Sequence, residues 1–507
     1  MSSQVLEIET KYDVDDAAAL PPLDQLPKVG SVAEPEQQVL VETYHDTPQL
    51  DLLHAGITLR RRVGGGDAGW HLKLPAGLDR LEVHALLSGS ETEVPELFRD
   101  IVQALVRNRA LVEVARIETH RTVTLLRDAE YNALAEVCDD RVVATRLANE
   151  QKDEQHSWRE WELELRKPDS EIAREGRRAL ISSGARPSRS ASKLARVLAN
   201  PRGLHAPAKT RKSPLAGTSV ADVVGEHLAR HVAELRRLDP LARADVPDAV
   251  HRMRVECRRI RGAFASFRSF FDAGISDSLR PELKWLIDEL GRPRDLEVLR
   301  GRIEALVEEE TGLDGSVGPR IAHVLEEEHR LAHRQAVEAM RDPRYFALID
   351  GLQAIVDHPP WSARAHQRAR KELPKVVRKE WQRVSKAADE ARHASPDVLA
   401  ARLHDVRKAA KRARYAAEAI EPVAGKDATR FAHSMTVLQD TLGEHHDTVV
   451  ARQKVIDLSN SPPADDPARP EFERLLGRLA DTGREAEESY GHALSRAARP
   501  KRLRWLG

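Results

Sequence analysis

The chain has 507 residues, of which 41% are apolar and 32% are charged, so it is long enough for two or three buried cores and apolar enough to fold. Its 80 Lys and Arg residues nearly balance its 81 Asp and Glu residues. This balance excludes a uniformly basic protein, but it allows charges that are sorted onto separate surfaces. Aromatic residues make up 4% of the chain, which argues against nucleic-acid binding by base stacking.

The sequence also bears on the compartment. Cys138 and Cys257 are far apart and lack metal-binding spacing, which fits a reducing environment without disulfides. Acidic residues at positions 7 and 9 stand where a signal peptide would be apolar, and no run of about 18 apolar residues predicts a membrane span. We expect a cytoplasmic protein.

Residues 1–198 predict a largely antiparallel α+β domain with many strands. Short segments alternate between apolar and charged residues, which is typical of strands with two different faces. Gly64–Gly66 indicates a turn rather than a phosphate-binding loop, because no Lys-Ser/Thr pair and helix follow it. The expected strands are 5–12, 58–63, 70–74, 119–126, 133–138 and 158–165, and the expected helices are 25–26, 96–107 and 171–180.

Several of these strands place charges on one face and apolar residues on the other. Glu7, Glu9 and Lys11 share a face because successive side chains alternate. Arg60 and Arg62 do the same, as do Glu162 and Glu164. One such strand is typical of an exposed sheet face, but the recurrence favours a barrel whose interior is charged.

The chain changes character after residue 198. Residues 199–216 contain three prolines, two glycines and several basic residues without an apolar period, which is typical of a linker. From residue 217 to about 500, apolar residues recur at steps of three and four in segments rich in Ala, Arg, Glu and Leu. This pattern predicts amphipathic helices.

The helical half repeats itself, at about 217–345 and 365–500. A basic segment followed by a Leu-Gly-x-x-x-Asp-x-x-Val segment occurs twice with nearly equal spacing, which predicts two similar helical bundles. Each basic segment places four residues along one helical stripe, and a twofold relation would bring the stripes together so that a polyanion could relieve their repulsion. The stripes are His251, Arg254, Arg258 and Arg261, and His404, Arg407, Lys411 and Arg414. Pro293 predicts a kink or loop before Asp295 in the first copy.

The first half resembles the CYTH family, also called triphosphate tunnel metalloenzymes. The resemblance rests on Glu-x-Glu-x-Lys at 7–11, Tyr-His-Asp-Thr at 44–47, Leu-Arg-Arg-Arg at 59–62, Arg-Leu-Glu at 80–82, Glu-Leu-Glu at 162–164 and Ser-Lys at 192–193. It implies an eight-stranded antiparallel tunnel that cleaves triphosphates with Mg²⁺ or Mn²⁺. The implied triphosphate-binding residues are Lys11, Arg60, Arg62, Lys73, Arg80, Arg121 and Lys193.

The same resemblance implies a set of metal ligands and catalytic residues. The ligands are Glu7, Glu9, Glu82, Asp139, Glu162 and Glu164, and the catalytic residues are Glu7, Glu9 and Lys11. Hard divalent cations prefer carboxylate oxygens, while Arg and Lys suit phosphate. The family often places an Asp after the strand expected to end at Cys138, and either Asp139 or Asp140 fits this place.

The second half resembles the CHAD family. His-x-x-Arg followed by Arg or Lys and Arg, and then Leu-Gly-x-x-x-Asp-x-x-Val, match both halves of that family's internal repeat. The resemblance implies an all-α domain of two repeated helical bundles that binds polyphosphate through the two basic stripes. Localisation to polyphosphate granules is a further expectation.

The expected function is therefore metal-dependent hydrolysis of inorganic triphosphate, with polyphosphate binding by the helical half. One alternative is a polyphosphate-binding or targeting protein without turnover. Others are the remaining CYTH activities, which are adenylate cyclase and thiamine or nucleoside triphosphatase. The charges in the tunnel do not choose among these, because they contact phosphates rather than bases.

Overall fold

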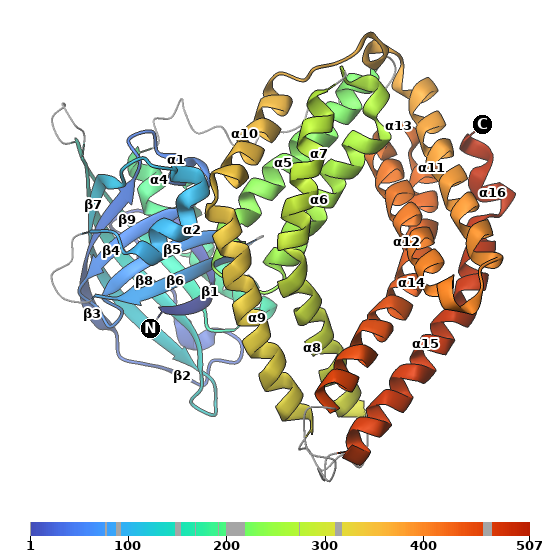
Figure 1. Ribbon diagram of the computed structural model, residues 1–507. Helices are drawn as coiled ribbons and strands as arrows, with labels where there is room; N and C mark the ends of the chain where they lie inside the picture. The colour runs from blue at the N-terminus through green and yellow to red at the C-terminus, as the bar shows by residue number, and fades with distance from the viewer. Residues whose placement is uncertain are drawn as a thin grey trace. The chain divides into compact units, whose positions relative to one another are not determined.

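The computed structural model describes residues 2–506 except 77–78, 88–92, 148–153, 168, 191, 199–217, 273, 310–316 and 460–468. The predicted linker at 199–216 lies outside the described residues. The chain divides into two compact units, Met1–Lys209 and Thr210–Gly507. In Figure 1 the labelled strands all belong to the first unit, and helices α5 to α16 belong to the second.

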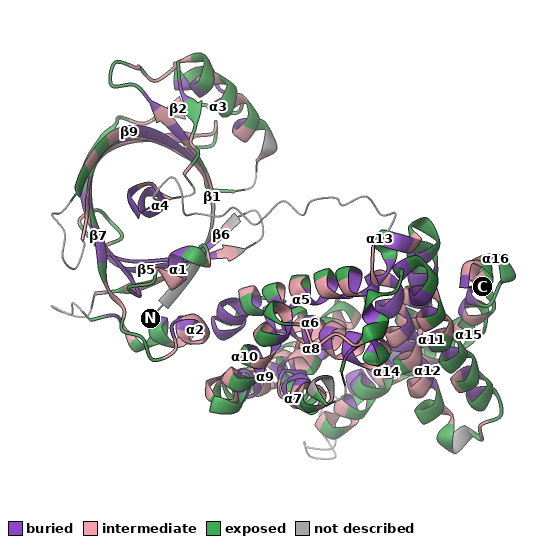
Figure 2. Cartoon of the chain, turned by 90° about the horizontal axis from the view of Figure 1, so that it is seen from above, coloured by how far each residue is buried: buried purple, intermediate pink, exposed green. Residues whose placement is uncertain are grey.

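The first unit is built on antiparallel strands that close into a ring (Figure 2). The strands are β1 (Ser2–Val14), β2 (Ser31–Val32), β3 (Glu36–Asp46), β4 (Thr58–Val63), β5 (Gly69–Ala76), β6 (Asp79–Leu86), β7 (Val112–Arg127), β8 (Ala133–Arg146), β9 (Glu154–Leu165) and β10 (Arg186–Pro187). Eight of them pair in the order β1-β6-β5-β4-β3-β7-β8-β9, and β9 pairs with β1 to close the ring. The predicted eight-stranded antiparallel tunnel is confirmed.

Strand β8 is longer than the sequence predicted. The expected strand ended at Cys138, but β8 continues to Arg146. The two aspartates that follow Cys138 have basic partners on the neighbouring strands. Arg121 lies opposite Asp140 in the β7–β8 register, and Arg159 of β9 binds Asp139. Charge compensation across the strands therefore allows β8 to continue.

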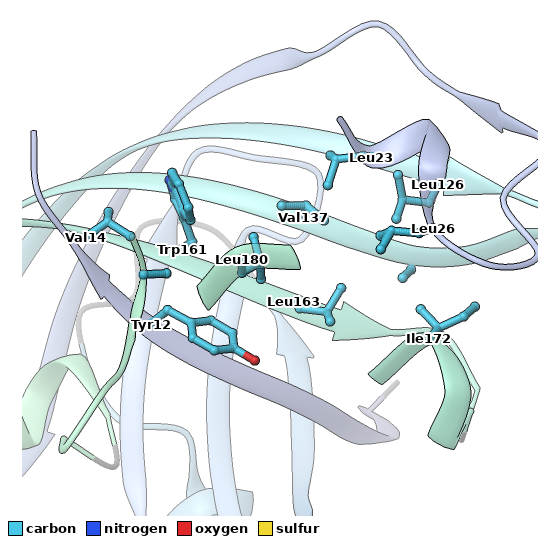
Figure 3. Close-up of a cluster of buried hydrophobic side chains, with 12 residues drawn as sticks. Tyr12, Val14, Leu23, Leu26, Leu126, Val137, Trp161, Leu163, Ile172 and Leu180 are labelled. Carbon is cyan, nitrogen blue, oxygen red and sulfur yellow. The ribbon is translucent and has the colours of Figure 1, made fainter. Parts of the chain in front are cut away.

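The outer face of the ring is apolar. Trp161 and Leu163 of β9 point outward and pack with Val137 of β8, whereas the acidic residues that alternate with them point inward (Figure 3). Helix α3 (Ser170–Ser182) covers this face with Ile172 and Leu180. The remaining helical segments of the unit are η1 (Leu23–Gln25), α1 (Asp51–His54), α2 (Glu96–Val106) and α4 (Lys193–Leu198).

Helix α4 lies inside the ring of strands in Figure 2. Its apolar residues pack against residues of β3, β7 and β8 in a buried cluster that includes Tyr44, Ile117 and Ala144. This packing holds the first residue of the helix, Lys193, in a buried position beside the polar part of the tunnel.

The second unit is helical. Its helices are α5 (Val220–Arg243), α6 (Ala249–Ser266), α7 (Ile275–Glu289), α8 (Gly291–Glu309), α9 (Val317–Arg341), α10 (Pro343–Asp357), α11 (Ala369–Arg392), α12 (Pro396–Ala419), α13 (Glu421–Ala424), α14 (Lys426–Ser459), α15 (Arg469–Ala497) and α16 (Pro500–Leu503), with short turns η2 (Arg268–Phe270), η3 (Ala363–His366) and η4 (Arg504–Leu506). Helices α8, α9, α14 and α15 share one apolar core, which includes Leu299, Ile321, Val455 and Phe472. No helix in the described part of the chain is long and apolar enough to cross a membrane.

The two repeats differ where the sequence predicted a difference. In the second repeat, α14 runs without a break through Leu438–Gly443 and Asp447. In the first repeat, the corresponding stretch is split, because α7 ends at Glu289 and α8 begins at Gly291. Pro293 lies in the first turn of α8, where a missing backbone N–H costs little. The predicted interruption before Asp295 is confirmed.

Candidate active site and basic surface

The ring of strands encloses a polar cavity of about 700 Å³. Nine Lys or Arg residues and nine Asp or Glu residues line it among the described residues, so its fixed charges balance. The basic residues are Lys11, Arg60, Arg62, Lys73, Arg80, Arg121, Arg127, Arg166 and Lys193, and the acidic residues are Glu9, Glu34, Glu36, Glu42, Asp67, Glu82, Glu136, Glu162 and Glu164. All the predicted triphosphate-binding residues lie on this cavity.

One wall of the cavity is formed where β1 meets β9. Lys11 lies opposite Glu162 in the register of these strands, and Glu9 lies opposite Glu164. The Lys11 ammonium contacts Glu162 and lies 3.1 Å from Glu9 Oε2. Burial alone would raise the pKa of Glu9, but Lys11 and Lys73 lower it to about 2. Glu9 is therefore ionised across the physiological range.

Strand β8 and helix α4 extend this wall. The guanidinium of Arg121 donates two hydrogen bonds to the carboxylate of Asp140, at 2.8 and 2.7 Å. The Lys193 ammonium lies 2.9 Å from Asp140 and 2.8 Å from an oxygen of each of Glu160 and Glu162. Burial opposes ionisation of Glu162, yet Lys11, Lys193 and Arg121 hold its pKa well below the usual range.

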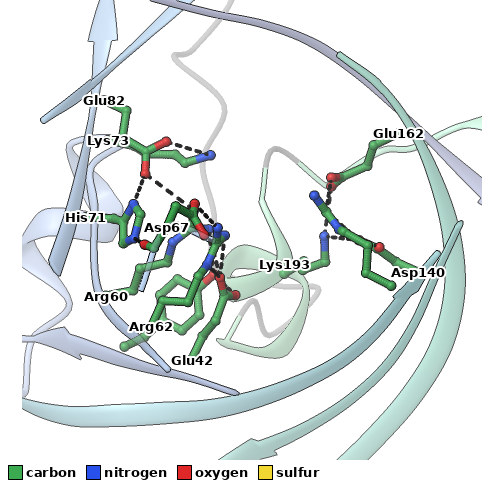
Figure 4. Close-up of polar contacts among 12 residues, drawn as sticks. Glu42, Arg60, Arg62, Asp67, His71, Lys73, Glu82, Asp140, Glu162 and Lys193 are labelled. Carbon is green, nitrogen blue, oxygen red and sulfur yellow. Dashed lines mark hydrogen bonds and ion pairs between the residues drawn. The ribbon is translucent and has the colours of Figure 1, made fainter. Parts of the chain in front are cut away.

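The opposite wall is formed by β3 to β6 (Figure 4). Arg62 binds the buried carboxylate of Glu42 through Nε at 2.9 Å and Nη2 at 2.7 Å. Arg60 lies 3.3 Å from the same carboxylate and 3.5 Å from Glu82. Despite its burial, Glu42 has a pKa well below the usual range because of these two guanidinium groups. This wall therefore holds two arginines that are paired with carboxylates of the chain.

Two groups of carboxylates have the geometry to hold a metal ion. One consists of Glu9, Glu162 and Glu164, and the other of Asp140, Glu160 and Glu162. Within each group the ligand atoms lie within 4.8 Å of one another. All the donors are carboxylate oxygens, which suits a hard divalent cation such as Mg²⁺ or Mn²⁺. The residues that are present therefore fit the implied metal.

The predicted ligand set needs correction at two positions. Asp139 points away from the tunnel and pairs with Arg159, at 2.8 and 2.7 Å, so Asp140 is the aspartate of β8 that joins the carboxylates. Glu82 lines the cavity, but it lies on the opposite wall with His71, Arg60 and Lys73 and belongs to neither carboxylate group. The side chain of Glu7 lies outside the described residues.

Glu160, Glu42 and His71 also contribute side chains to the tunnel region, and the sequence analysis did not predict them. Glu160 precedes Glu162 by two residues and points to the same side of β9, so alternation alone was a sufficient signal. His71 precedes Lys73 by two residues on β5, so the same signal was present for it, whereas Glu42 is identified by its partners on β4. His71 contacts Glu82 through Nδ1 and the backbone oxygen of Asp67 through Nε2.

In the second unit, the basic stripes of α6 and α12 lie close together. Burial lowers the pKa of Lys411 to about 7, and the charges of Arg258, Arg407 and Arg254 add to this effect. Burial and Arg254 also lower the pKa of Arg258. Arg259 of α6 donates to Glu418 of α12 at 3.4 Å, and Arg412 of α12 donates to Ser266 of α6 at 3.3 Å, so the two helices pack together, as the internal repeat predicted.

The order of the two motifs, which is the same in both repeats, has a geometric explanation. A Cβ atom on Gly291 would lie 3.0 Å from the Arg254 guanidinium, and one on Gly443 would lie 3.1 Å from that of Arg407. Each glycine therefore makes room for the arginine of the matching His-x-x-Arg segment. Arg254 also donates to Asp295 at 2.8 Å.

Two residues of the second stripe have local partners. The His404 ring lies against that of His446, tilted, with ring centroids 5.0 Å apart, and burial lowers the pKa of both His404 and His251. Arg414 donates to Glu418 at 2.7 Å. Arg414, like Arg254, is thus paired with a neighbouring carboxylate.

Comparisons with known proteins follow the same division of the chain. The CYTH domain matches residues 6–197, and the CHAD domain matches residues 226–455. An uncharacterized protein of Mycobacterium tuberculosis is 36% identical over 468 residues, which cover 89% of this chain and 88% of that protein. PptA from Streptomyces chartreusis is 22% identical with a TM-score of 0.46, covering 55% of this chain and 100% of that one. The CHAD domain from the plant Ricinus communis is 22% identical with a TM-score of 0.44, covering 57% and 97%.

Proposed function

Because the chain belongs to the family of proteins in which a CYTH domain precedes a CHAD domain, we propose that it hydrolyses inorganic triphosphate with Mg²⁺ or Mn²⁺ and binds polyphosphate through its helical unit. The observation that carries the proposal is the arrangement of the cavity. The wall of β1, β8 and β9 holds both carboxylate groups that have metal-binding geometry, and the wall of β3 to β6 holds Arg60 and Arg62 beside Glu42. This arrangement suits a phosphate chain that lies between a metal and a set of guanidinium groups.

The residues of the chain would position and neutralise the substrate. Arg60 and Arg62 offer planar donors to phosphate oxygens, and Lys73 adds a charge on the neighbouring strand. Glu9, Glu162 and Glu164 would hold a metal ion. When bound, such an ion neutralises phosphate charge and acidifies a coordinated water. Phosphoryl transfer depends mainly on such positioning and charge stabilisation, so the cavity needs no covalent nucleophile.

A phosphate-release assay on the full chain tests the hydrolytic part. Inorganic triphosphate, ATP, thiamine triphosphate and polyphosphate would each be offered with Mg²⁺ and with Mn²⁺. We expect release from inorganic triphosphate in particular, and we expect Glu9→Gln to abolish it while circular dichroism shows an intact fold. Wild-type turnover by the Glu9→Gln protein at saturating metal would overturn the metal assignment.

A salt titration tests the polyphosphate part. By analogy with nucleic acids, counterion release makes the slope of log affinity against log salt scale with the number of phosphates contacted. Replacing Arg254, Arg258, Arg407 and Lys411 by Ala should weaken binding and flatten this slope. The control replaces the four exposed residues Arg368, Arg370, Lys371 and Lys375. Equal losses from both sets would mean diffuse attraction rather than a site.

A further inference from the structure

Each of the two carboxylate groups in the tunnel contains a lysine ammonium of the chain itself. Lys11 contacts Glu162 and Glu9, which belong to the first group. Lys193 lies within 2.9 Å of all three members of the second group, Asp140, Glu160 and Glu162. Glu162 belongs to both groups and contacts both lysines.

A divalent ion and an ammonium would compete for the same oxygens. The metal needs carboxylate oxygens at about 2.1 Å, and two cations that share one compact group would repel each other strongly in a buried site. The ligand atoms of each group span at most 4.8 Å, and both lysine side chains are largely buried. Metal binding therefore has to displace the ammonium from the carboxylates.

The released ammonium has a second destination. Lys11 and Lys193 both line the cavity, together with the arginines of the opposite wall. Their backbones are fixed by the β1–β9 pairing and by the apolar packing of α4. The flexible four-carbon stem of lysine allows the charge to move while the backbone stays in place. Arg121 is different, because its planar group is held by two bonds to Asp140.

We propose that Lys11 and Lys193 are exchangeable counter-ions, which occupy the metal-binding carboxylates and pass to phosphate oxygens when a divalent ion takes those carboxylates. The inference rests on the proposed function of this site and deepens it. Metal binding frees positive charge for the substrate, and by linkage the substrate strengthens metal binding by the same factor. Lys11 thereby links metal and phosphate binding in addition to being a contact for phosphate.

Binding of Mn²⁺ to the full chain, with no phosphate compound present, tests the exchange. Electron paramagnetic resonance would report free Mn²⁺ for the wild type and for Lys11→Met, Lys193→Met and Lys11→Arg at a pH of about 8. We expect each methionine variant to bind Mn²⁺ about tenfold more tightly, which is the size of effect that one neighbouring charge has on an ionic equilibrium. Lys11→Arg keeps the charge and should stay near the wild type.

Arg62→Met is the matched control. Arg62 is also buried and lines the same cavity, but it lies 2.7 Å from Glu42 on the opposite wall. Its removal changes the charge of the tunnel by the same amount and should tighten Mn²⁺ binding much less. Unchanged or weaker binding by Lys11→Met, or an equal gain in Arg62→Met, would overturn the exchange. Damage to the fold would weaken Mn²⁺ binding, so it cannot mimic the expected gain.

This titration is independent of turnover. If the chain hydrolyses no triphosphate but Lys11→Met binds Mn²⁺ more tightly, the exchange stands and the proposed reaction fails. If the chain hydrolyses triphosphate and the affinity for Mn²⁺ is unchanged in Lys11→Met, the reaction stands and the exchange fails.

Discussion

The tunnel and the basic surface of α6 and α12 handle positive charge in opposite ways. In the tunnel, cations lie against carboxylates, as in the pairs Arg62–Glu42 and Arg121–Asp140. Although burial opposes it, Glu162 and Glu9 raise the pKa of Lys11. On the helices, cations lie near other cations, and Lys411 has a pKa lowered to about 7 by burial and by Arg258, Arg407 and Arg254.

This difference indicates how each region would acquire a phosphate chain. An enclosed cavity with balanced charges is stable before the substrate arrives, but its cations become available only when something replaces them on the carboxylates. A metal ion is suited to do this. A surface of neighbouring cations is ready for a polyanion without a metal, and it carries a cost in stability until the polyanion binds. We therefore expect triphosphate turnover, but not polyphosphate binding, to depend on metal.

The largest expected effect is that of Glu162→Gln. Glu162 belongs to both carboxylate groups, so its loss should lower the kcat for triphosphate by roughly a thousandfold or more. This is the size of effect expected when a metal ion or a group that stabilises charge in the transition state is removed. Polyphosphate affinity should not change, because the stripes lie in the other unit. Steady-state phosphate release and a polyphosphate binding assay on the same protein check both parts, and residual turnover within tenfold of the wild type would contradict the assignment.

The next effect separates two adjacent aspartates. Asp140→Asn should lower triphosphate turnover by about 10- to 100-fold, since it removes the partner that orients Arg121 and Lys193. Asp139→Asn is the matched control on the outer side of the same strand. Its turnover should stay within about twofold of the wild type, because the Arg159 pair that it breaks lies away from the cavity. If turnover falls by a similar factor in both variants, the assignment of Asp140 rather than Asp139 to the tunnel is wrong.

The sequence contained the information that distinguishes Asp139 from Asp140. Alternation along β8 places Val137 on the apolar outer face, and Asp139 shares its parity, so the strand pattern favours Asp140 as the inner residue. The early strand end expected at Cys138 hid this signal, because the compensating Arg121 and Arg159 lie on other strands. The family motifs predicted Lys11, Arg60, Arg62 and Glu162 correctly as residues of the cavity.

Other features could not be predicted from local patterns. Glu42 is bound by Arg60 and Arg62 of the next strand, and that pairing follows from the strand order rather than from any spacing within β3. The same holds for Lys193, whose three carboxylate partners come from β8 and β9. In the helical unit the repeat predicted that the stripes meet, but no local pattern shows that each glycine makes room for an arginine of another helix.

A smaller effect is expected from Lys411→Met, with opposite signs for stability and binding. The pKa of Lys411 is lowered from 10.5 to about 7 in the folded state, so between these values the unfolded chain binds more protons and stability rises with pH. Removing the charge should stabilise the protein by about 1–2 kcal/mol near pH 7 and by less near pH 10, while weakening polyphosphate binding several-fold. Calorimetry at the two pH values, with a binding assay, checks this. A destabilised variant at pH 7 would show that Lys411 is not under repulsion.

The smallest effect concerns the space beside Arg407. Gly443→Ala would place a methyl group 3.1 Å from the guanidinium, so Arg407 should shift and polyphosphate affinity should fall by a few-fold. Gly477→Ala on the exposed face of α15 is the control, since nothing lies within 4 Å of the added carbon. It should leave the affinity unchanged and stabilise the helix by about 0.5–1 kcal/mol. Equal affinities for the two variants would mean that the position of Arg407 is not important for binding.

The contrast between the two regions is tested most directly by removing metal from one preparation of the wild-type chain. Triphosphate hydrolysis and polyphosphate binding would be measured in EDTA and again after Mg²⁺ or Mn²⁺ is restored. We predict that hydrolysis is lost in EDTA and returns with metal, while polyphosphate affinity at constant ionic strength stays the same throughout. Hydrolysis that persists in EDTA, or polyphosphate binding that disappears with the metal, would contradict the division of roles between the tunnel and the helical surface.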